Sequence, residues 1–328
     1  MIISYNGVEM ETKHWTEISD ETFTELKNAY YAKPDISAVK KEMISISKGG
    51  TKNTEITNYF VKDLMAKTKL YHSKWSIEDV FNCKDLLAHF VEKTMCNKKV
   101  YPDEMPLIKK VEVAFRLGGK GAARKPSNFP IKTVDYILSK YNKNNCWYDF
   151  SCGWGARLTG GLKNDVNYFG TDPNYMLTLR LGELAKLWRV AIGHKSYTEI
   201  RTQGSEVFVP EWEGKMGLAF SSPPYFCLED YKIGNQSWNE NVNYDMWLSG
   251  YMTDTIKNIH KYLIPDGIFA INVNNFSNYN LVADIKKIAL ENGFEYVTTE
   301  VLENIKRANS NGGLNDNSEG VMIFKKKK

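Results

Sequence analysis

Two glycines in the stretch Tyr148–Leu158 could bring the chain backbone close to a ligand. An acidic residue, Asp149, comes near the end of an apolar segment, and Gly153 and Gly155 then open a helical one. Glycine adopts backbone angles that a side chain forbids, so a ligand can approach the main chain at such a turn. In doubly wound sheets, the first strand-to-helix turn is where a nucleotide-like cofactor binds. A plain tight turn is the alternative. No G-x-x-x-x-G-K-[ST] sequence follows, which argues against an ATPase phosphate loop.

A second acidic residue, Asp172, follows the next apolar segment, Val166–Thr171, and lies 17 residues after Gly155. At about this spacing an acidic side chain accepts hydrogen bonds from ribose hydroxyls. An acid at this position favours the unphosphorylated ribose of NAD or S-adenosylmethionine over that of NADP. The residue could also cap a helix that has Pro173 in its first turn, and the two roles are compatible.

A third stretch, Ser222-Pro223-Pro224-Tyr225, discriminates between these cofactors. It follows the apolar segment Met216–Ser221 and begins 67 residues after Gly155. Two prolines alone could simply end a strand. A polar residue, two prolines and an aromatic residue in this order, after a glycine loop and an acid, resemble the amino-methyltransferases. These enzymes methylate exocyclic amines and carry a [DNS]-P-P-[YFW] motif.

The resemblance covers about residues 125–328 and implies that S-adenosylmethionine is the cofactor. The family's loop usually has an aromatic residue where this chain has Ser151, and Phe150 or Trp154 could supply the lost packing. The segment Arg124–Pro130 resembles the one that closes over the methionine end of the cofactor. The implied cofactor-binding residues are Asp149, Phe150, Ser151, Gly153, Gly155, Asp172, Pro173, Ser205, Asn128 and Phe129.

The resemblance also implies a mechanism in which Ser222, Pro223, Pro224 and Tyr225 are the catalytic residues. An exocyclic amine is a poor nucleophile because its lone pair is delocalised into the ring. The Ser222 side chain and the Pro223 carbonyl would accept its two hydrogens, and the prolines would hold these acceptors in place. Tyr225 would stack on a base flipped out of the duplex, a contact worth roughly 1–3 kcal/mol.

The expected reaction is methyl transfer to a DNA base, as in restriction-modification systems, by direct displacement and without a metal. Serine at the head of the motif slightly favours cytosine over adenine. Carbon-5 methylation is excluded because it typically uses a Pro-Cys pair, which this sequence lacks. The alternatives are an RNA or a protein-glutamine methyltransferase, although the latter usually carries Asn-Pro-Pro-Tyr, and a catalytically idle nucleic-acid-binding protein.

Composition and charge fit a nucleic-acid-binding protein of the cytoplasm. The 328 residues are 42% hydrophobic, contain no apolar run that could span a bilayer, and include five cysteines without a C-x-x-C pair. The net charge is +4, yet the segment 116–143 alone holds seven basic residues and one acidic residue. Such a segment could bind phosphates, and a solvated surface is an equal alternative. The residues expected to contact nucleic acid are Arg116, Lys120, Arg124, Lys125 and Arg307.

The spacing of apolar residues predicts the helices and strands that position these residues. Residues 1–117 are expected to form a helical region that binds nucleic acid or a partner, and residues 118–328 the methyltransferase domain. In that domain, helical patterns such as Leu177, Leu181 and Leu184 alternate with short apolar segments, which predicts a mostly parallel sheet. The last two strands have no helix between them, so the last is expected to be antiparallel, as in the Rossmann-like class I methyltransferase fold. The predicted strands are 145–150, 166–171, 216–221, 268–273, 296–302 and 321–325.

Overall fold

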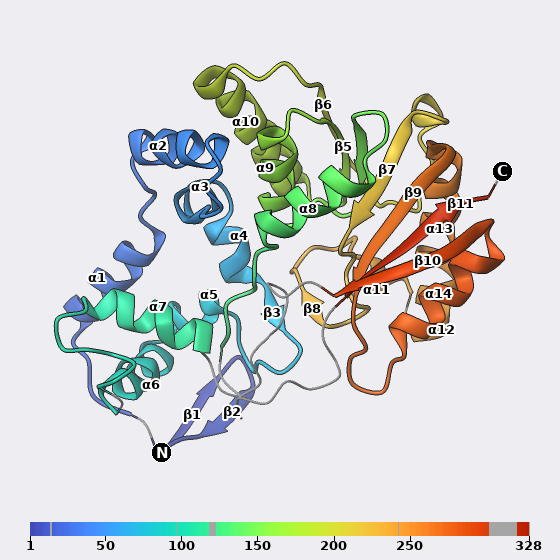
Figure 1. Ribbon diagram of the computed structural model, residues 1–328. Helices are drawn as coiled ribbons and strands as arrows, with labels where there is room; N and C mark the ends of the chain where they lie inside the picture. Colours follow the sequence, from blue (N-terminus) through green and yellow to red (C-terminus); the bar gives the residue numbers. More distant parts are fainter. Residues whose placement is uncertain (14, 97, 118–122, 242, 302–319, 328) are drawn as a thin grey trace. The chain divides into compact units, whose positions relative to one another are not determined.

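A computed structural model describes the whole chain except residues 14, 97, 118–122, 242, 302–319 and 328 (Figure 1). The described residues form two compact units. The first consists of Met1–Pro34, Lys62–Ser127 and Glu229–Lys232, and the second of Asp35–Val61, Asn128–Leu228 and Ile233–Lys328. This division differs from the single boundary predicted after residue 117, because residues 35–61 belong to the second unit.

The first unit begins with a β-hairpin, which the helical reading of residues 1–117 did not include. Strands β1 (Ile2–Tyr5) and β2 (Val8–Glu11) pair antiparallel. Asn6 and Gly7 connect them with φ angles of 51° and 72°. Asn-Gly is the dipeptide that favours this kind of two-residue turn, so the signal for the hairpin was present in the sequence.

Helices make up most of the rest of the first unit. Aromatic side chains from these helices and from Phe81, which directly follows one of them, pack in its core. The ring centroids of Tyr30 and Phe81 lie 4.6 Å apart, and those of Phe90 and Phe115 lie 4.7 Å apart. Leu86 and Phe90, four residues apart, are both buried in this unit. The helices are α1 (Asp20–Tyr31), α4 (Lys62–Lys67), α5 (Ile77–Val80), α6 (Lys84–Met95) and α7 (Leu107–Leu117), and β3 (Lys69–Leu70) pairs with β8 (Glu229–Asp230).

A seven-stranded sheet forms the centre of the second unit, in the order β10-β11-β9-β7-β4-β5-β6. All neighbouring pairs from β9 to β6 are parallel, and β11 alone is antiparallel to both of its neighbours. The predicted fold, a mostly parallel sheet with an antiparallel last strand, is therefore confirmed. Its strands are β4 (Cys146–Asp149), β5 (Asn167–Asp172), β6 (Thr198–Thr202), β7 (Met216–Ser221), β9 (Leu263–Val273), β10 (Phe294–Val301) and β11 (Gly320–Lys326).

Helices cover both faces of this sheet. Figure 1 shows α8, α9 and α10 along one face, and α13 and α14 along the other. The spacing of Leu177, Leu181 and Leu184 correctly predicted α10, and all three side chains are buried. None of the described helices has the length and apolar composition needed to cross a membrane. The helices of this unit are α2 (Ile36–Ser47), α3 (Thr54–Phe60), α8 (Ile131–Tyr141), α9 (Ala156–Lys163), α10 (Tyr175–Ile192), η1 (Pro210–Trp212), α11 (Ser237–Glu240), α12 (Tyr244–Trp247), η2 (Leu248–Met252), α13 (Thr253–Tyr262) and α14 (Leu281–Glu291).

Two strands differ from the prediction for physical reasons. Strand β6 was not predicted, because an edge strand of sequence Thr-Glu-Ile-Arg-Thr lacks an apolar run. Strand β9 begins at Leu263, five residues before the predicted strand 268–273, and includes Pro265-Asp266-Gly267, residues that are typical of turns. Asp266 takes a φ of 59°, and the pairing of β9 with β7 shifts register near it, so the turn residues form an irregularity within the strand.

Segment 35–61 joins the second unit through α10. Helices α2 and α3 both pack against α10. The Arg180 Nη1 donates a hydrogen bond of 3.1 Å to the Phe60 carbonyl, and the Asn128 Nδ2 donates one of 2.9 Å to the Thr57 Oγ1. Ile56 and Phe60 have helical spacing and are buried in α3, but such spacing does not reveal which sheet a helix covers.

Candidate functional site

The strand order of the second unit reverses beside β4. The chain leaves β4 toward β5 on one side, and β7 lies on the other side, so the strand order reverses at this point. In open α/β sheets, ligands bind outside the carboxyl ends of the strands where the order reverses. The carboxyl ends of β4, β5 and β7 carry Asp149, Asp172 and Ser221, and parallel strands place these residues at one edge.

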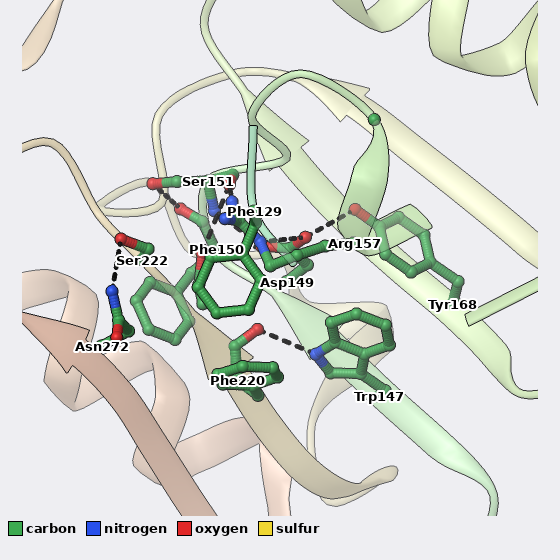
Figure 2. Close-up of polar contacts among 12 residues, drawn as sticks. Phe129, Trp147, Asp149, Phe150, Ser151, Arg157, Tyr168, Phe220, Ser222 and Asn272 are labelled. Atoms are coloured by element: carbon green, nitrogen blue, oxygen red, sulfur yellow. Dashed lines mark hydrogen bonds and ion pairs between the residues drawn. The ribbon is translucent and has the colours of Figure 1, made fainter. Parts of the chain in front are cut away.

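Asp149 lies at the centre of a buried polar cluster at the end of β4. Its carboxylate is fully buried and accepts hydrogen bonds from Arg157 Nε (3.0 Å), Tyr168 OH (2.9 Å) and Ser221 Oγ (2.7 Å) (Figure 2). Arg157 also donates to the Ser151 carbonyl oxygen. These contacts occupy both oxygens of Asp149, so this residue supports the glycine loop through protein partners.

Both glycines of the loop have backbone conformations that favour glycine. Gly153 has a φ of 59°, and a Cβ there would lie 3.0 Å from the Arg157 guanidinium. Gly155 has a φ of 84° and is the residue at which α9 begins. A Cβ on Gly155 would lie 2.9 Å from Leu181 of α10. At these two positions of the loop, no Cβ covers the backbone.

Asp172 supplies a half-buried carboxylate at the end of β5, beside this loop. Its Oδ1 accepts the backbone N–H of Asn174 at 3.0 Å, and the Gly153 N–H also bonds to the carboxylate. Burial raises the pKa of Asp172 from 3.8 to about 7, against the opposing effect of these N–H groups. The fold thus brings the predicted ribose acid and the glycine loop together, and Pro173 follows Asp172 directly.

Tyr251 lies between Ser205 and Ser151, which is at the β4 end of the loop. It belongs to the π-helical turn η2, a kind of irregularity that often occurs at functional sites. The Tyr251 hydroxyl lies 3.5 Å from Ser151 Oγ and also bonds to the Ser205 side chain. Ser205 is buried and bonds to Thr255 Oγ1 at 2.8 Å. Ser151 and Ser205, both predicted to bind the cofactor, thus share one tyrosine.

The predicted segment Asn128–Phe129 lies on the other side of the Arg157 guanidinium. The Phe129 ring centroid is 5.4 Å from the Arg157 Cζ and 5.7 Å from the ring of Phe220. Asn128 Oδ1 accepts the N–H of Phe129 at 3.0 Å, which orders the segment locally. Phe150, by contrast, is 1% exposed and its ring packs against Tyr148 and Phe269 in the core beneath the loop.

The Ser222–Tyr225 motif leaves β7 next to a buried asparagine of β9. Asn272 is 2% exposed, and its Nδ2 donates to Ser222 Oγ at 3.3 Å (Figure 2). The same Nδ2 also donates to Tyr225 OH at 3.3 Å. The Tyr225 hydroxyl donates to the Asn272 carbonyl at 3.2 Å. One residue therefore orients the first and last side chains of the motif.

Phe226 fixes the turn that follows the two prolines. It has a φ of 50°, which is uncommon for a bulky residue. Its ring is buried and contacts the rings of Tyr244, Trp247 and Tyr279 at 5.4–6.0 Å. This aromatic packing holds Phe226 in a strained conformation, of the kind that persists where surrounding structure stabilises it.

The residues predicted to contact nucleic acid belong to the first unit or fall outside the described residues. Arg116 and Arg124 are exposed, whereas Lys125 is half-buried. Lys120 and Arg307 lie outside the described residues. In the part of the chain that is described, no group of three or more His, Cys, Asp or Glu side chains could hold a metal ion.

The predictions missed several residues of the site: Tyr168 and Ser221, which bond to Asp149, and Arg157, Tyr251 and Asn272. Arg157 follows the glycine loop by two residues, and a charged residue at that position was the available signal. Asn272 is the polar residue of the otherwise apolar predicted strand 268–273. Tyr251 had no signal, because its role depends on the contact between η2 and the loop.

Comparisons with known proteins find likeness in structure only. No protein-family profile matches the chain, and no curated protein does. Similar solved structures include a TehB-like S-adenosylmethionine-dependent methyltransferase from Corynebacterium glutamicum (15% identity, 59% of this chain and 87% of that one, TM-score 0.39). Others are an S-adenosylmethionine-dependent O-methyltransferase from Thermotoga maritima (12%, 62% and 68%, 0.42) and an N1-methyltransferase from Burkholderia thailandensis with bound S-adenosylhomocysteine (13%, 60% and 78%, 0.40). At these identities the likeness concerns the fold alone.

Proposed function

We propose that this chain transfers a methyl group from S-adenosylmethionine to an exocyclic amine of a DNA base. The observation that carries the proposal is the hydrogen bond of 2.7 Å between Ser221 and Asp149. It joins the start of the Ser222–Tyr225 motif to the base of the glycine loop. A site for an amine and a site for a nucleotide-like cofactor are then neighbours at the point where ligands bind in sheets of this type.

The residues present fit the cofactor. Gly153 and Gly155 keep side chains away from the loop backbone, and Asp172 offers a carboxylate for ribose hydroxyls. Ser205 and Tyr251 bring hydroxyl groups to the same loop. When bound, S-adenosylmethionine would supply a methyl group on a positively charged sulfur.

The motif residues would prepare the amine. Ser222 Oγ and the Pro223 carbonyl would accept hydrogen bonds from the two N–H groups of the amine, which would free the nitrogen lone pair for attack on the methyl group. Tyr225 would stack on the base. Asn272 donates a hydrogen bond to Ser222 Oγ, and a hydroxyl oxygen has two lone pairs, so a second one is left for an N–H of the amine. The serine slightly favours cytosine as the target. DNA is preferred because the order of the motifs resembles that of DNA amino-methyltransferases, and Ser222 argues against a protein-glutamine enzyme, which usually carries Asn-Pro-Pro-Tyr.

Radiolabelled methyl transfer to mixed DNA, RNA and protein, followed by mass spectrometry of the nucleosides, tests the proposal. We expect label in DNA on an exocyclic nitrogen and none at cytosine carbon 5. Label in RNA or in glutamine would be consistent with the proposed cofactor and with the role of the motif, but it would contradict DNA as the substrate. Binding of nucleic acid without any methyl transfer, in the presence of bound S-adenosylmethionine, would favour the idle protein instead.

A further inference from the structure

The first unit contains a cluster of basic residues around a single carboxylate. Glu112 of α7 pairs with Lys62 through Oε1 and with Lys109 through Oε2, each at 2.8 Å. Lys62 is 8% exposed, and its ammonium lies 4.1 Å from the centroid of the Tyr30 ring. The two lysines together outweigh the single carboxylate, so this group of three side chains carries a net positive charge.

Lys125 adds a further positive charge to this cluster. Its backbone N–H donates to the Phe115 carbonyl at 3.1 Å, which holds it at the last turn of α7 next to Arg116. Burial lowers the pKa of Lys125, and so do the nearby charges of Lys62, Arg116 and Lys109. Within the described ranges, neither Lys125 nor Arg116 forms an ion pair. Placing a half-buried ammonium among like charges costs folding free energy unless an anion joins it.

We propose that Lys125, Arg116 and Lys109 bind a phosphate group in the first unit. A phosphate would offer oxygens to three cations, of which only Lys109 pairs with a carboxylate, the Glu112 side chain that also binds Lys62. Guanidinium and ammonium groups both bind phosphate well. The Tyr30 hydroxyl adds a second observation: it is buried beside this cluster and has no hydrogen-bond partner in the described part of the chain. Two sources share this chemistry, the backbone of a nucleic acid and free phosphate.

The site extends the proposed function and can be tested without it, because binding needs neither cofactor nor methyl transfer. The first measurement is fluorescence anisotropy of a short labelled DNA duplex with the full-length protein at several salt concentrations. Loss of one phosphate contact should reduce the slope of log affinity against log salt by about 0.9 and weaken binding about fivefold at 0.15 M salt. We expect these changes in Lys125→Gln, and near-normal binding in Lys125→Arg, which keeps the charge.

Lys93 provides a matched control in the same unit. It too is a lysine whose pKa is lowered by burial, yet no neighbouring lysine contributes to that shift. Lys93→Gln should therefore leave the salt slope unchanged. If Lys93→Gln and Lys125→Gln reduce the slope equally, a specific site is excluded.

Thermal unfolding separates a binding role from a structural one. Removing an unpaired, half-buried charge should raise the melting temperature of Lys125→Met while its affinity for DNA falls. Inorganic phosphate at 10 mM should raise the melting temperature of the unmutated protein more than that of Lys125→Gln. If phosphate protects but DNA binding does not depend on Lys125, the site takes free phosphate. If neither phosphate protection nor the DNA salt slope depends on Lys125, the proposal is wrong.

Discussion

At the scale of single residues, the acidic side chains at the carboxyl ends of β4 and β5 differ in their burial and in their hydrogen-bond partners. Asp149 is fully buried and bonded to protein groups on both oxygens, so it holds the loop in place. Asp172 at the next strand end is half-buried with a raised pKa, which suits a group that awaits a ligand. Burial and partners therefore distinguish two acids that look alike in the sequence.

The pKa of Asp172 predicts a pH dependence of cofactor binding. Ribose hydroxyls donate to the ionised carboxylate, which predominates only above about pH 7. Affinity for S-adenosylmethionine should therefore fall as the pH is lowered from 8 to 6, by up to about tenfold per unit below the pKa. Asp172→Asn should bind roughly 10- to 150-fold more weakly at pH 8, the loss of a charge-assisted hydrogen bond, and should show a flat profile. Calorimetry at three pH values measures both effects. If affinity changed equally with pH in the two proteins, Asp172 would not be the group that binds the ribose.

The same shift sets the sign of the effect of Asp172 on stability. Its pKa is about 7 in the folded chain and 3.8 ordinarily, so between these values the folded state binds more protons than the unfolded state. The contribution of Asp172 to stability is therefore present below about pH 4 and is lost as the pH rises toward 7. A bound ribose would offset this loss by favouring the ionised form.

Asn272 predicts a loss of turnover without a loss of cofactor. Asn272→Leu removes the donor to Ser222 and Tyr225, and a hydrogen bond of this kind is worth about 0.5–1.5 kcal/mol. We expect turnover to fall roughly 2- to 10-fold, with unchanged affinity for S-adenosylmethionine. Tyr225→Phe, which keeps the ring and loses the hydroxyl, is the comparison. If Asn272 acts through Ser222, its effect should largely disappear in a Ser222→Ala background.

At the scale of elements, the glycine loop depends on how closely α9 approaches α10. Gly155 begins α9 with a φ of 84°, and a Cβ there would meet Leu181 at 2.9 Å. The connection from β4 through the loop to α9 therefore requires glycine at this position.

Gly155→Ala should therefore destabilise the protein, and Gly182→Ala should not. The first substitution combines a left-handed backbone with overpacking, at a cost of about 1–3 kcal/mol. Gly182 lies within α10 with no atom within 4 Å of a Cβ, so alanine should stabilise the helix by up to about 1 kcal/mol. Urea denaturation of the two variants measures the difference, and equal stabilities would show that the loop can rearrange.

At the scale of the whole molecule, the chain crosses between its two units more than once. Residues 35–61 contribute α2 and α3 to the unit that contains the sheet, although they come early in the chain. Met43 of α2 is fully buried, and Leu26 of α1 is 5% exposed in the other unit.

This arrangement predicts where two similar core substitutions will act. Met43→Ala and Leu26→Ala should each cost about 2–5 kcal/mol. Met43→Ala should increase hydrogen exchange in α10 and in the neighbouring glycine loop, because α2 packs on α10. Leu26→Ala should increase exchange in α6 and α7 instead. Peptide-level exchange by mass spectrometry gives the answer, and unchanged protection of α10 in Met43→Ala would favour a boundary near residue 117.

Much of the sheet and the order of the motifs could be read from the sequence. The predicted strands at 145–150, 166–171 and 216–221 correspond to β4, β5 and β7, because buried parallel strands are short apolar runs between helical patterns. Gly153, Gly155, Asp172 and Ser222–Tyr225 stand directly after such runs. Local chemistry and strand ends therefore determined where the candidate site residues are.

Only the tertiary structure decided which of these residues are buried behind protein partners and which are left partly exposed. Asp149 and Phe150 became buried supports because Arg157, Tyr168 and the core surround them. Asn272 and Tyr251 entered the site because β9 lies beside β7 and η2 lies against the loop. Such contacts join residues from 47 to 100 positions apart, as in Tyr225 with Asn272 and Ser151 with Tyr251. No local pattern records them, since they depend on strand order and on the packing of helices over the sheet.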